Sequence, residues 1–159
     1  MPSDAGRVES INVSRGGVPK TSVLEARITE RGVIGDKQVQ RVFHGGRDRA
    51  VVLFSLDVIE RLQHEGHPIH AGSTGENLTI SGLDWRDIVP GVELQVGEAR
   101  LFITKYTSPC STIRESFLDG EFVRISQTLH PGWSRVCARV VTEGVVRPND
   151  PVEIVKGTV

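Results

Sequence analysis

The feature that most constrains the fold of this chain is a pair of alternating runs joined by a tight turn. Val92-Glu-Leu-Gln-Val96 alternates apolar and polar side chains, Gly97-Glu98 follows, and a second run extends from Ala99 to Thr104. A period of two places alternate side chains on opposite faces of a strand. Glycine at the first turn position suits a type II′ turn, which needs positive φ there. These residues predict a β-hairpin with one buried face.

Most of the remaining chain also favours strands. The 17 glycines among 159 residues indicate many tight turns, as is typical of a mostly β protein. The run from Ala50 to Phe54 is continuously apolar, which predicts a strand buried on both faces. Further strands are expected around Val8, Ile11 and Val13, and over Ser22 to Thr29, Trp133 to Thr142 and Pro151 to Lys156.

Helices are expected to be few and short. Ser55 precedes a helical pattern over Leu56 to His64 and is expected to cap it. Two more helices are expected, one capped by Ser111 or Thr112 and ending at Asp119-Gly120, and one over Glu121 to Leu129. The sum predicts a single α+β, mostly β domain over residues 1–159, built as a closed or nearly closed barrel with short peripheral helices.

The composition excludes several classes of protein. With 38% hydrophobic and 25% charged residues, the chain has the balance of a folded domain. A net charge of −1 gives no basic surface for nucleic acid or an anionic membrane. Neither a signal segment nor an apolar run of spanning length is present, so a soluble, cytoplasmic protein is expected. Two cysteines do not form the disulfide framework of a secreted domain.

The two cysteines lie in different settings. Cys137 falls inside a strand pattern and is expected to pack in the core, since a free cysteine behaves as a small hydrophobe. Cys110 follows a strand end and precedes a plausible helix start, where peptide dipoles and free N–H groups favour a reactive thiolate. A buried structural thiol is the alternative, and the residues alone favour it. A cysteine-protease pairing of Cys110 with His44 or His130 stays open, although no local signature supports it.

Three turns combine glycine with charged or amide side chains: Ile34-Gly-Asp-Lys37, His44-Gly-Gly-Arg-Asp48 and Thr74-Gly-Glu-Asn-Leu78. Glycine allows close approach of the backbone to a ligand, and successive free N–H groups can bind an anion. None of the three matches a P-loop or a dinucleotide-binding motif. Each alone reads as an ordinary turn, whereas the set suggests a binding site.

A zinc site is not expected, although His64, His67 and His70 recur at every third position. Gly66 and Pro68 interrupt the segment, so no helix face gathers the imidazoles. No thiol or carboxylate is placed as a clear fourth ligand. A solvated loop is the simpler interpretation of this stretch.

A set of motifs occurs in a fixed order along the chain: Ile34 to Lys37, His44 to Gly46 with Asp48 and Ala50-Val51, Gly75 to Leu78, the Val92 to Thr104 hairpin, Pro109-Cys110, Trp133 with Arg135-Val136, and Gly144 to Val146 with Asp150 and Val152. In this order the motifs resemble the MOSC domain family, named for the C-terminal domain of molybdenum-cofactor sulfurase, and in particular its stand-alone YiiM-like bacterial members. The resemblance covers roughly residues 8–156. Departures from the family pattern are Lys37 where many members have arginine, Pro90-Gly91 where many have Gly-Asp, and the lack of a glycine before Asp150.

The resemblance implies a barrel like the β-barrel domain of pyruvate kinase and a site around Cys110. It implies binding of molybdenum cofactor, with Cys110 as the molybdenum ligand, and reduction of N-hydroxylated small molecules with electrons from an external flavoprotein or iron–sulfur partner. The alternative is a sulfur carrier that holds a persulfide on Cys110 without turnover of its own. Pyridoxal phosphate binding is a further family-level expectation. A third possibility is a small barrel with an inert cysteine.

The chemistry of the cofactor suggests which other residues bind it. A soft thiolate suits a sulfur-rich metal centre, and a phosphate group needs backbone N–H groups and cations. Amide and hydroxyl groups could recognise the edge of the pterin. The expected cofactor-binding residues are Asp36, Lys37, His44, Gly45, Gly46, Arg47, Arg49, Gly75, Glu76, Asn77, Thr107, Ser108 and Arg135.

Overall fold

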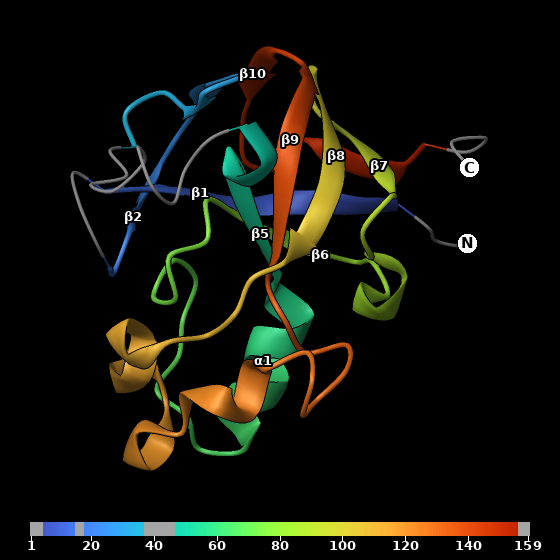
Figure 1. The fold of residues 1–159 in the computed structure, drawn as a ribbon. Coiled ribbons are helices and arrows are strands. Elements are labelled where there is room, and N and C mark those ends of the chain that lie inside the picture. The colour runs from blue at the N-terminus through green and yellow to red at the C-terminus, as the bar shows by residue number, and fades with distance from the viewer. Residues whose placement is uncertain (1–4, 15–17, 37–46, 156–159) are drawn as a thin grey trace.

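The structure is a computed structural model and describes residues 5–14, 18–36 and 47–155. Strands are the main regular structure of the described chain, and Figure 1 shows them wrapping around a common interior. Seven strands form the main body: β1 (Ala5–Val13), β5 (Val51–Ser55), β6 (Leu78–Ser81), β7 (Glu93–Val96), β8 (Ala99–Tyr106), β9 (Val136–Thr142) and β11 (Pro151–Ile154). Four short strands accompany them: β2 (Thr21–Val23), β3 (Ala26–Thr29), β4 (Gly32–Val33) and β10 (Gly144–Val146).

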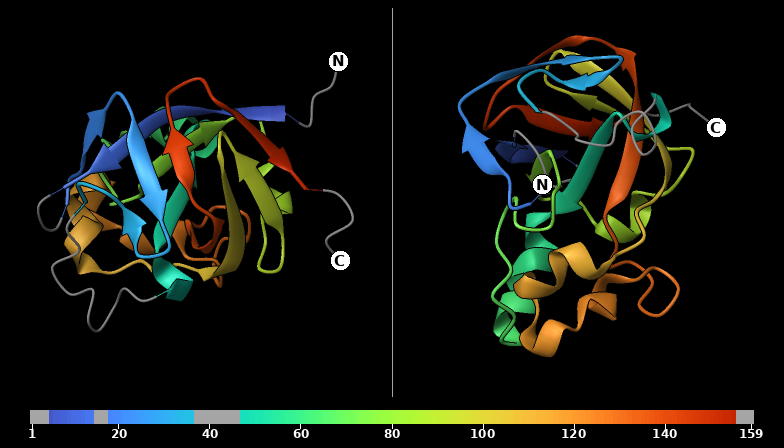
Figure 2. Two further views of the ribbon diagram at one scale, coloured as in Figure 1. Left: turned by 90° about the horizontal axis from the view of Figure 1, so that it is seen from above. Right: turned by 60° about the vertical axis from the view of Figure 1, so that its left-hand side comes forward.

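The seven strands close into a barrel. Their order is β11-β7-β8-β9-β5-β6-β1, and β1 pairs back onto β11, so neither end of this sheet is left open (Figure 2). Strand β2 extends the sheet beside β1, and β10, β3 and β4 form a separate small sheet. The prediction of an α+β, mostly β barrel is confirmed.

The hairpin predicted around Gly97 forms β7 and β8. Val96 pairs with Ala99 in the ladder, and Gly97 has φ +54, as a turn with positive φ at its first position requires. Leu94, Val96, Ala99 and Leu101 are fully buried, so one face of the hairpin supplies the barrel interior.

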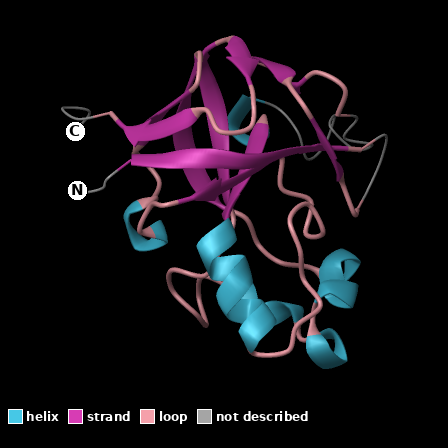
Figure 3. Cartoon of the chain, turned by 180° about the vertical axis from the view of Figure 1, so that it is seen from behind, coloured by secondary structure: helices cyan, strands magenta, loops and turns pink. Residues whose placement is uncertain are grey.

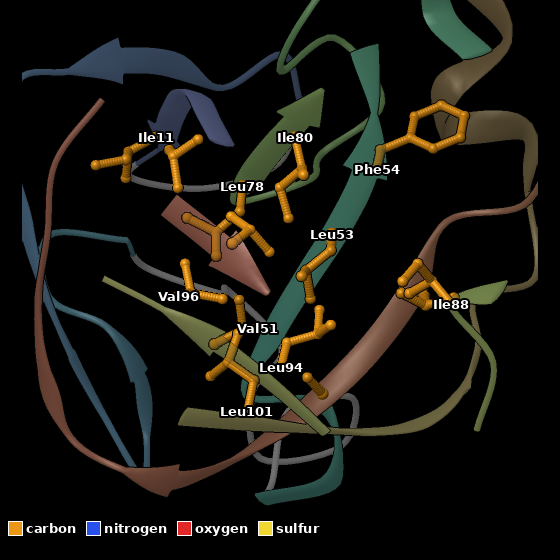
Figure 4. Packing of buried hydrophobic residues seen from close by; sticks show 14 of the residues in the cluster. Ile11, Val51, Leu53, Phe54, Leu78, Ile80, Ile88, Leu94, Val96 and Leu101 are labelled. Atoms are coloured by element: carbon orange, nitrogen blue, oxygen red, sulfur yellow. The ribbon is translucent and has the colours of Figure 1, made fainter. Parts of the chain in front are cut away.

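Strand β5 is buried on both faces, as its continuous apolar run predicts. Figure 4 shows Val51 and Leu53 pointing into the barrel and Phe54 pointing to the other side of the strand. All three are fully buried. The barrel interior is completed by further aliphatic side chains: Ile11, Leu78, Ile80, Leu94, Val96 and Leu101.

A β-bulge explains why the first strand does not alternate cleanly in the sequence. Val8 and Ile11 are three residues apart, yet both are fully buried. The register between β1 and β6 shifts between Val8 and Ser10, and one extra residue turns the following side chains to the opposite face.

The helical lobe, defined here as α1 (Leu56–His64) with η3 (Ser111–Ser116), η4 (Leu118–Gly120) and η5 (Phe122–Ile125), gathers beyond one end of the barrel (Figure 3). Helix α1 begins as predicted, because the Ser55 hydroxyl accepts the amide N–H of Val58 at 3.1 Å. Two more 3-10 helices, η1 (Arg47–Arg49) and η2 (Trp85–Asp87), lie elsewhere. No helix in the described ranges is long and apolar enough to cross a membrane.

Side-chain contacts join the parts of the helical lobe. Arg124 of η5 donates to both carboxylate oxygens of Glu65 at 3.0 and 2.8 Å. Its guanidinium also lies 4.0 Å from the ring centroid of Trp133. Arg124 therefore connects the end of α1 to the segment that enters β9.

Four of the predicted elements are wrong in detail. Ser22 to Thr29 forms two strands, because the chain leaves the barrel sheet at the exposed Leu24 and enters the small sheet. The two expected helices between residues 111 and 129 are short 3-10 helices, interrupted where Asp119 and Gly120 adopt positive φ. The strand expected from Trp133 begins only at Val136, because the residues before it connect to the helical lobe.

Substitution of Leu53 tests the closed core. Leu53→Ala removes a fully buried side chain from the barrel and should lower the free energy of unfolding by about 2–5 kcal/mol. The matched control is Val141→Ala in β9, because Val141 is 49% exposed and should change it by less than about 0.5 kcal/mol. Urea denaturation measures both. Equal losses in the free energy of unfolding in the two variants would contradict the burial of Leu53 inside the barrel.

Candidate functional site

Cys110 lies on a loop between the barrel and the helical lobe. The loop begins after β8, and Cys110 immediately precedes η3. The side chain is exposed, so the interpretation of Cys110 as a buried structural thiol is wrong. The Cys110 Sγ atom lies 2.9 Å from the Thr112 hydroxyl oxygen. The thiol is therefore both accessible and oriented by a neighbouring hydrogen-bonding group.

The surroundings of Cys110 favour its thiolate form. The hydrogen bond from the Thr112 hydroxyl is the main cause of a pKa of Cys110 below its ordinary value, with support from the Thr112 backbone and the positive charge of Arg135. Partial burial opposes this shift. Since the thiolate is the form of cysteine that attacks electrophiles and binds metals, the site is prepared for either reaction.

Arg135 connects the Cys110 loop to the turn that contains the Gly-Glu-Asn-Leu motif. Its guanidinium is buried, and Nη1 donates to the Thr74 carbonyl at 2.6 Å while Nη2 donates to the Ser108 carbonyl at 3.5 Å. The Nε atom has no partner among the described residues. Burial lowers the pKa of Arg135, and the negative charge of Glu76 opposes that effect.

The Glu76 side chain forms hydrogen bonds within the turn that contains the Gly-Glu-Asn-Leu motif. Its carboxylate is fully buried and accepts hydrogen bonds from the Gly72 amide at 2.8 Å, the Thr74 hydroxyl at 2.8 Å and the Thr79 hydroxyl at 3.1 Å. Gly75 has φ +87, a conformation that favours glycine. The polar atoms of Glu76 are thus used within the protein, and the turn is rigidly shaped beside Arg135.

Asn77 joins three segments of the chain. Its Oδ1 accepts the Val52 amide at 3.0 Å, and Nδ2 donates to the Asn12 carbonyl at 3.3 Å and to Asp36 Oδ2 at 2.9 Å. Asp36 also accepts from Lys20 Nζ at 2.5 Å in a buried ion pair. Asn77 and Asp36 therefore fix β1, β5 and the segment before residue 37 relative to one another.

A groove of about 360 Å³ lies beside the Cys110 loop. Thr112, which contacts the Cys110 thiol, also lines this groove. Val18 and His70 also line this groove. Hydroxyl groups of Ser73 and Ser116 and the carboxylate of Glu115 add polar groups to the lining. The volume falls in the range of small-molecule sites, so a ligand there would reach the vicinity of the thiol.

Other predicted site residues lie in separate places. Thr107 follows β8, and its hydroxyl lies 3.0 Å from the sulfur of Cys137, which is buried as predicted. Arg47 and Arg49 lie in η1 at the start of β5, where Arg47 pairs with Glu30 at 2.6 Å. Lys37, His44, Gly45 and Gly46 fall outside the described residues.

The three histidines that recur at every third position, His64, His67 and His70, have separate surroundings. His67 accepts the Leu118 amide at its Nδ1 atom, and its Nε2 atom is 3.4 Å from Glu65. His64 is exposed at the end of α1, whereas His70 lines the groove. No group of three or more histidine, cysteine or acidic side chains within the described ranges could hold a metal ion.

The sequence assigned no role in the site to four residues: Thr74, Thr112, Lys20 and His70. Thr112 lies two residues after Cys110 at a predicted helix start, where a threonine suits a cap, whereas its hydroxyl contacts the thiol. Lys20 had no signal, because its buried partner Asp36 is far away in the sequence. The regular spacing of the histidines drew attention to His70, but it does not indicate that this side chain lines a groove.

Comparison with known proteins agrees with this geometry. A family model described as the MOSC domain matches residues 40–153. The chain belongs to the MOSC domain family. Protein YiiM of Escherichia coli is 29% identical over 136 residues, which cover 82% of this chain and 59% of that protein. The chain thus spans less than two thirds of the length of this MOSC relative.

Two other relatives support the same family. The uncharacterized protein YflK of Bacillus subtilis is 29% identical over 172 residues, with 97% of this chain and 75% of that protein covered. The crystal structure of YiiM from Geobacillus stearothermophilus has a TM-score of 0.74 and 26% identity, with 95% of this chain and 75% of that chain covered. The MOSC resemblance noted in the sequence is therefore confirmed.

The reactivity of Cys110 tests the role of Thr112. In metal-free protein, Thr112→Val should raise the thiol pKa, because it removes the hydrogen bond that most favours the thiolate. Alkylation of Cys110 by iodoacetamide at neutral pH should slow about fivefold, the equivalent of a hydrogen bond of about 1 kcal/mol. Mass spectrometry measures the rate for each cysteine across pH. Thr128→Val, at an exposed threonine, is the control, and an equal rate in both variants would contradict the assignment.

Proposed function

We propose that this MOSC protein binds molybdenum cofactor through Cys110 and reduces N-hydroxylated small molecules. The observation that carries the proposal is one exposed thiol of lowered pKa beside a groove of about 360 Å³. Membership of the MOSC domain family supports the choice of cofactor. The substrate class follows from the resemblance to family members that act on such compounds.

The donor set at Cys110 fits the cofactor. A thiolate is a soft ligand and suits molybdenum that already carries the sulfur atoms of the pterin dithiolene. Because the dithiolene supplies further ligands, the protein needs no cluster of metal-binding side chains. The buried guanidinium of Arg135 lies behind the loop, and its positive charge favours the ligating thiolate.

The other predicted residues divide into two groups under this proposal. The polar atoms of Asp36, Glu76 and Asn77 form hydrogen bonds within the protein, and Glu76 and Asn77 are fully buried. These three residues therefore shape the site without touching the cofactor. The hydroxyl of the exposed Ser108 is assigned to the edge of the pterin. Thr107 is less suited to that role, because its hydroxyl contacts Cys137 and its backbone groups bond to Arg135 and Ser134. The cofactor phosphate is assigned to the basic and glycine-rich residues before β5: Lys37, His44, Gly45, Gly46, Arg47 and Arg49.

When bound, the cofactor supplies two-electron chemistry at the metal. The chain's own contribution is to hold the thiolate at Sγ of Cys110, to orient the cofactor against the groove and to place the substrate near it. An external flavoprotein or iron–sulfur protein supplies the electrons, and the reaction takes place in the cytoplasm, where thiols stay reduced.

Metal content tests the proposal. Protein purified from a host that makes the cofactor should contain about one molybdenum per chain, and Cys110→Ser should lose most of it, because serine is a poor ligand for a soft metal. Cys137→Ser controls for the loss of any cysteine. Elemental analysis gives the metal content, and reduction of benzamidoxime to benzamidine gives the activity. Molybdenum retained at full occupancy in Cys110→Ser would exclude Cys110 as the ligand.

A sulfur carrier is the second candidate, favoured by the exposure of Cys110, because a desulfurase must reach the acceptor sulfur. In that case incubation with a cysteine desulfurase and cysteine should add one sulfur atom to Cys110, detected by intact mass, in protein that holds no pterin. Stoichiometric pterin with no sulfur adduct would favour the reductase.

A further inference from the structure

Reduction of an N-hydroxyl group needs protons as well as electrons. The overall change is R–NH–OH + 2 e⁻ + 2 H⁺ → R–NH₂ + H₂O, in which the N–O bond breaks and its oxygen leaves as water. Departure as hydroxide is unfavourable at neutral pH, so a positioned acid that protonates the oxygen accelerates this step. Under the proposed function, such an acid must lie on the groove beside Cys110.

His70 occupies that place. It lies on the segment between α1 and β6 and lines the same groove as Thr112, whose hydroxyl contacts the Cys110 sulfur. A substrate held in this groove would therefore lie against both His70 and the residue that contacts the thiol. Histidine is the side chain that most readily donates and regains a proton near neutral pH.

Hydrogen bonds set the tautomer and the position of His70. Its Nδ1 atom lies 3.1 Å from the Ala71 carbonyl oxygen, which can only accept, so Nδ1 carries hydrogen and Nε2 is the atom that gains and loses a proton. The His70 amide donates to the Ser73 hydroxyl at 3.0 Å, and the Ser116 hydroxyl donates to the same oxygen at 2.8 Å. Ser73 thus ties His70 to η3, the helix that follows Cys110.

The neighbouring histidines cannot replace it. His67 is held by the Leu118 amide and Glu65 and packs edge-on against the ring of Phe117. His64 is exposed at the end of α1 and does not line the groove. Among the described residues, His70 is the imidazole on the groove.

We propose that His70 is the catalytic acid that protonates the departing oxygen of the N-hydroxylated substrate. This inference rests on the proposed function. The proton moves from Nε2 of the imidazolium to the oxygen as the N–O bond breaks, and the electron pair that cleaves the bond comes from the reduced cofactor, replenished by the external flavoprotein or iron–sulfur protein. The second proton reaches the nitrogen from solvent, which also reprotonates His70.

Among the described residues, Arg114 and Glu115 of η3 are the charged side chains that line the groove with His70. The Cys110 thiol contacts Thr112 of the same groove, and the Glu76 carboxylate accepts the Gly72 amide, two residues after His70. Substitution of His70 alone separates its effect on a pH profile from theirs.

Steady-state kinetics test the inference with benzamidoxime and molybdenum-loaded protein. The wild-type kcat should fall as pH rises through the range of about 5 to 8, in which histidine changes charge, because the imidazolium is the proton donor. His70→Gln should lower kcat about 100-fold or more and abolish that fall, whereas His64→Gln should match the wild type. Added imidazole should restore part of the activity of His70→Ala. An unchanged pH profile in His70→Gln overturns the inference and leaves the proposed function standing.

A second measurement needs no cofactor. In metal-free protein labelled at histidine, benzamidoxime should shift the ring resonances of His70 in NMR spectra and leave those of His64 unchanged. The absence of any shift at His70 overturns the inference, whatever the turnover. An inactive, molybdenum-loaded wild type would instead contradict the proposed reaction, and the proton donor with it.

Discussion

The site depends on one buried positive charge. Burial of an unpaired guanidinium costs several kcal/mol, so the structure surrounds Arg135 with acceptors: the Thr74 and Ser108 carbonyls and the nearby carboxylate of Glu76. These contacts come from two segments that are far apart in the sequence. Satisfying Arg135 therefore brings the Gly-Glu-Asn-Leu turn and the Cys110 loop together, and the same charge favours the Cys110 thiolate.

The barrel and the helical lobe have different tasks. The closed barrel provides a rigid frame, because all seven of its strands are paired on both sides. The candidate site lies where the chain leaves β8 for the helical lobe and where it returns into β9. Cys110 and Arg135 stand at these two crossings, with His70 on the segment from α1 to β6. Differences among MOSC proteins in the length and shape of such connections would change the groove without changing the frame.

The sequence predicted best what depends on local pattern. The hairpin at Gly97, the Ser55 cap and the doubly buried β5 each have a signal within a few residues, and all three formed. The Glu76 and Asn77 side chains were expected to face a ligand because they sit in a glycine turn, whereas their polar atoms bond within the protein. The partners of Asn77, among them Asp36 and Val52, are distant in sequence, so no local pattern predicts them. The Glu76 carboxylate bonds to groups within four residues of it, and its full burial removes it from a ligand. The Thr112 contact was missed for another reason, since a threonine after a cysteine equally suits a helix cap.

Hydrogen exchange in an Arg135 variant tests the central claim most directly, namely that this side chain holds two segments in one site. In Arg135→Met, amides of residues 72–77 and of 107–113 should lose protection together, while the β7–β8 hairpin keeps its own. Loss of protection in only one segment, or in neither, would contradict the account, because the turn and the Cys110 loop would then be held in place independently of the buried charge.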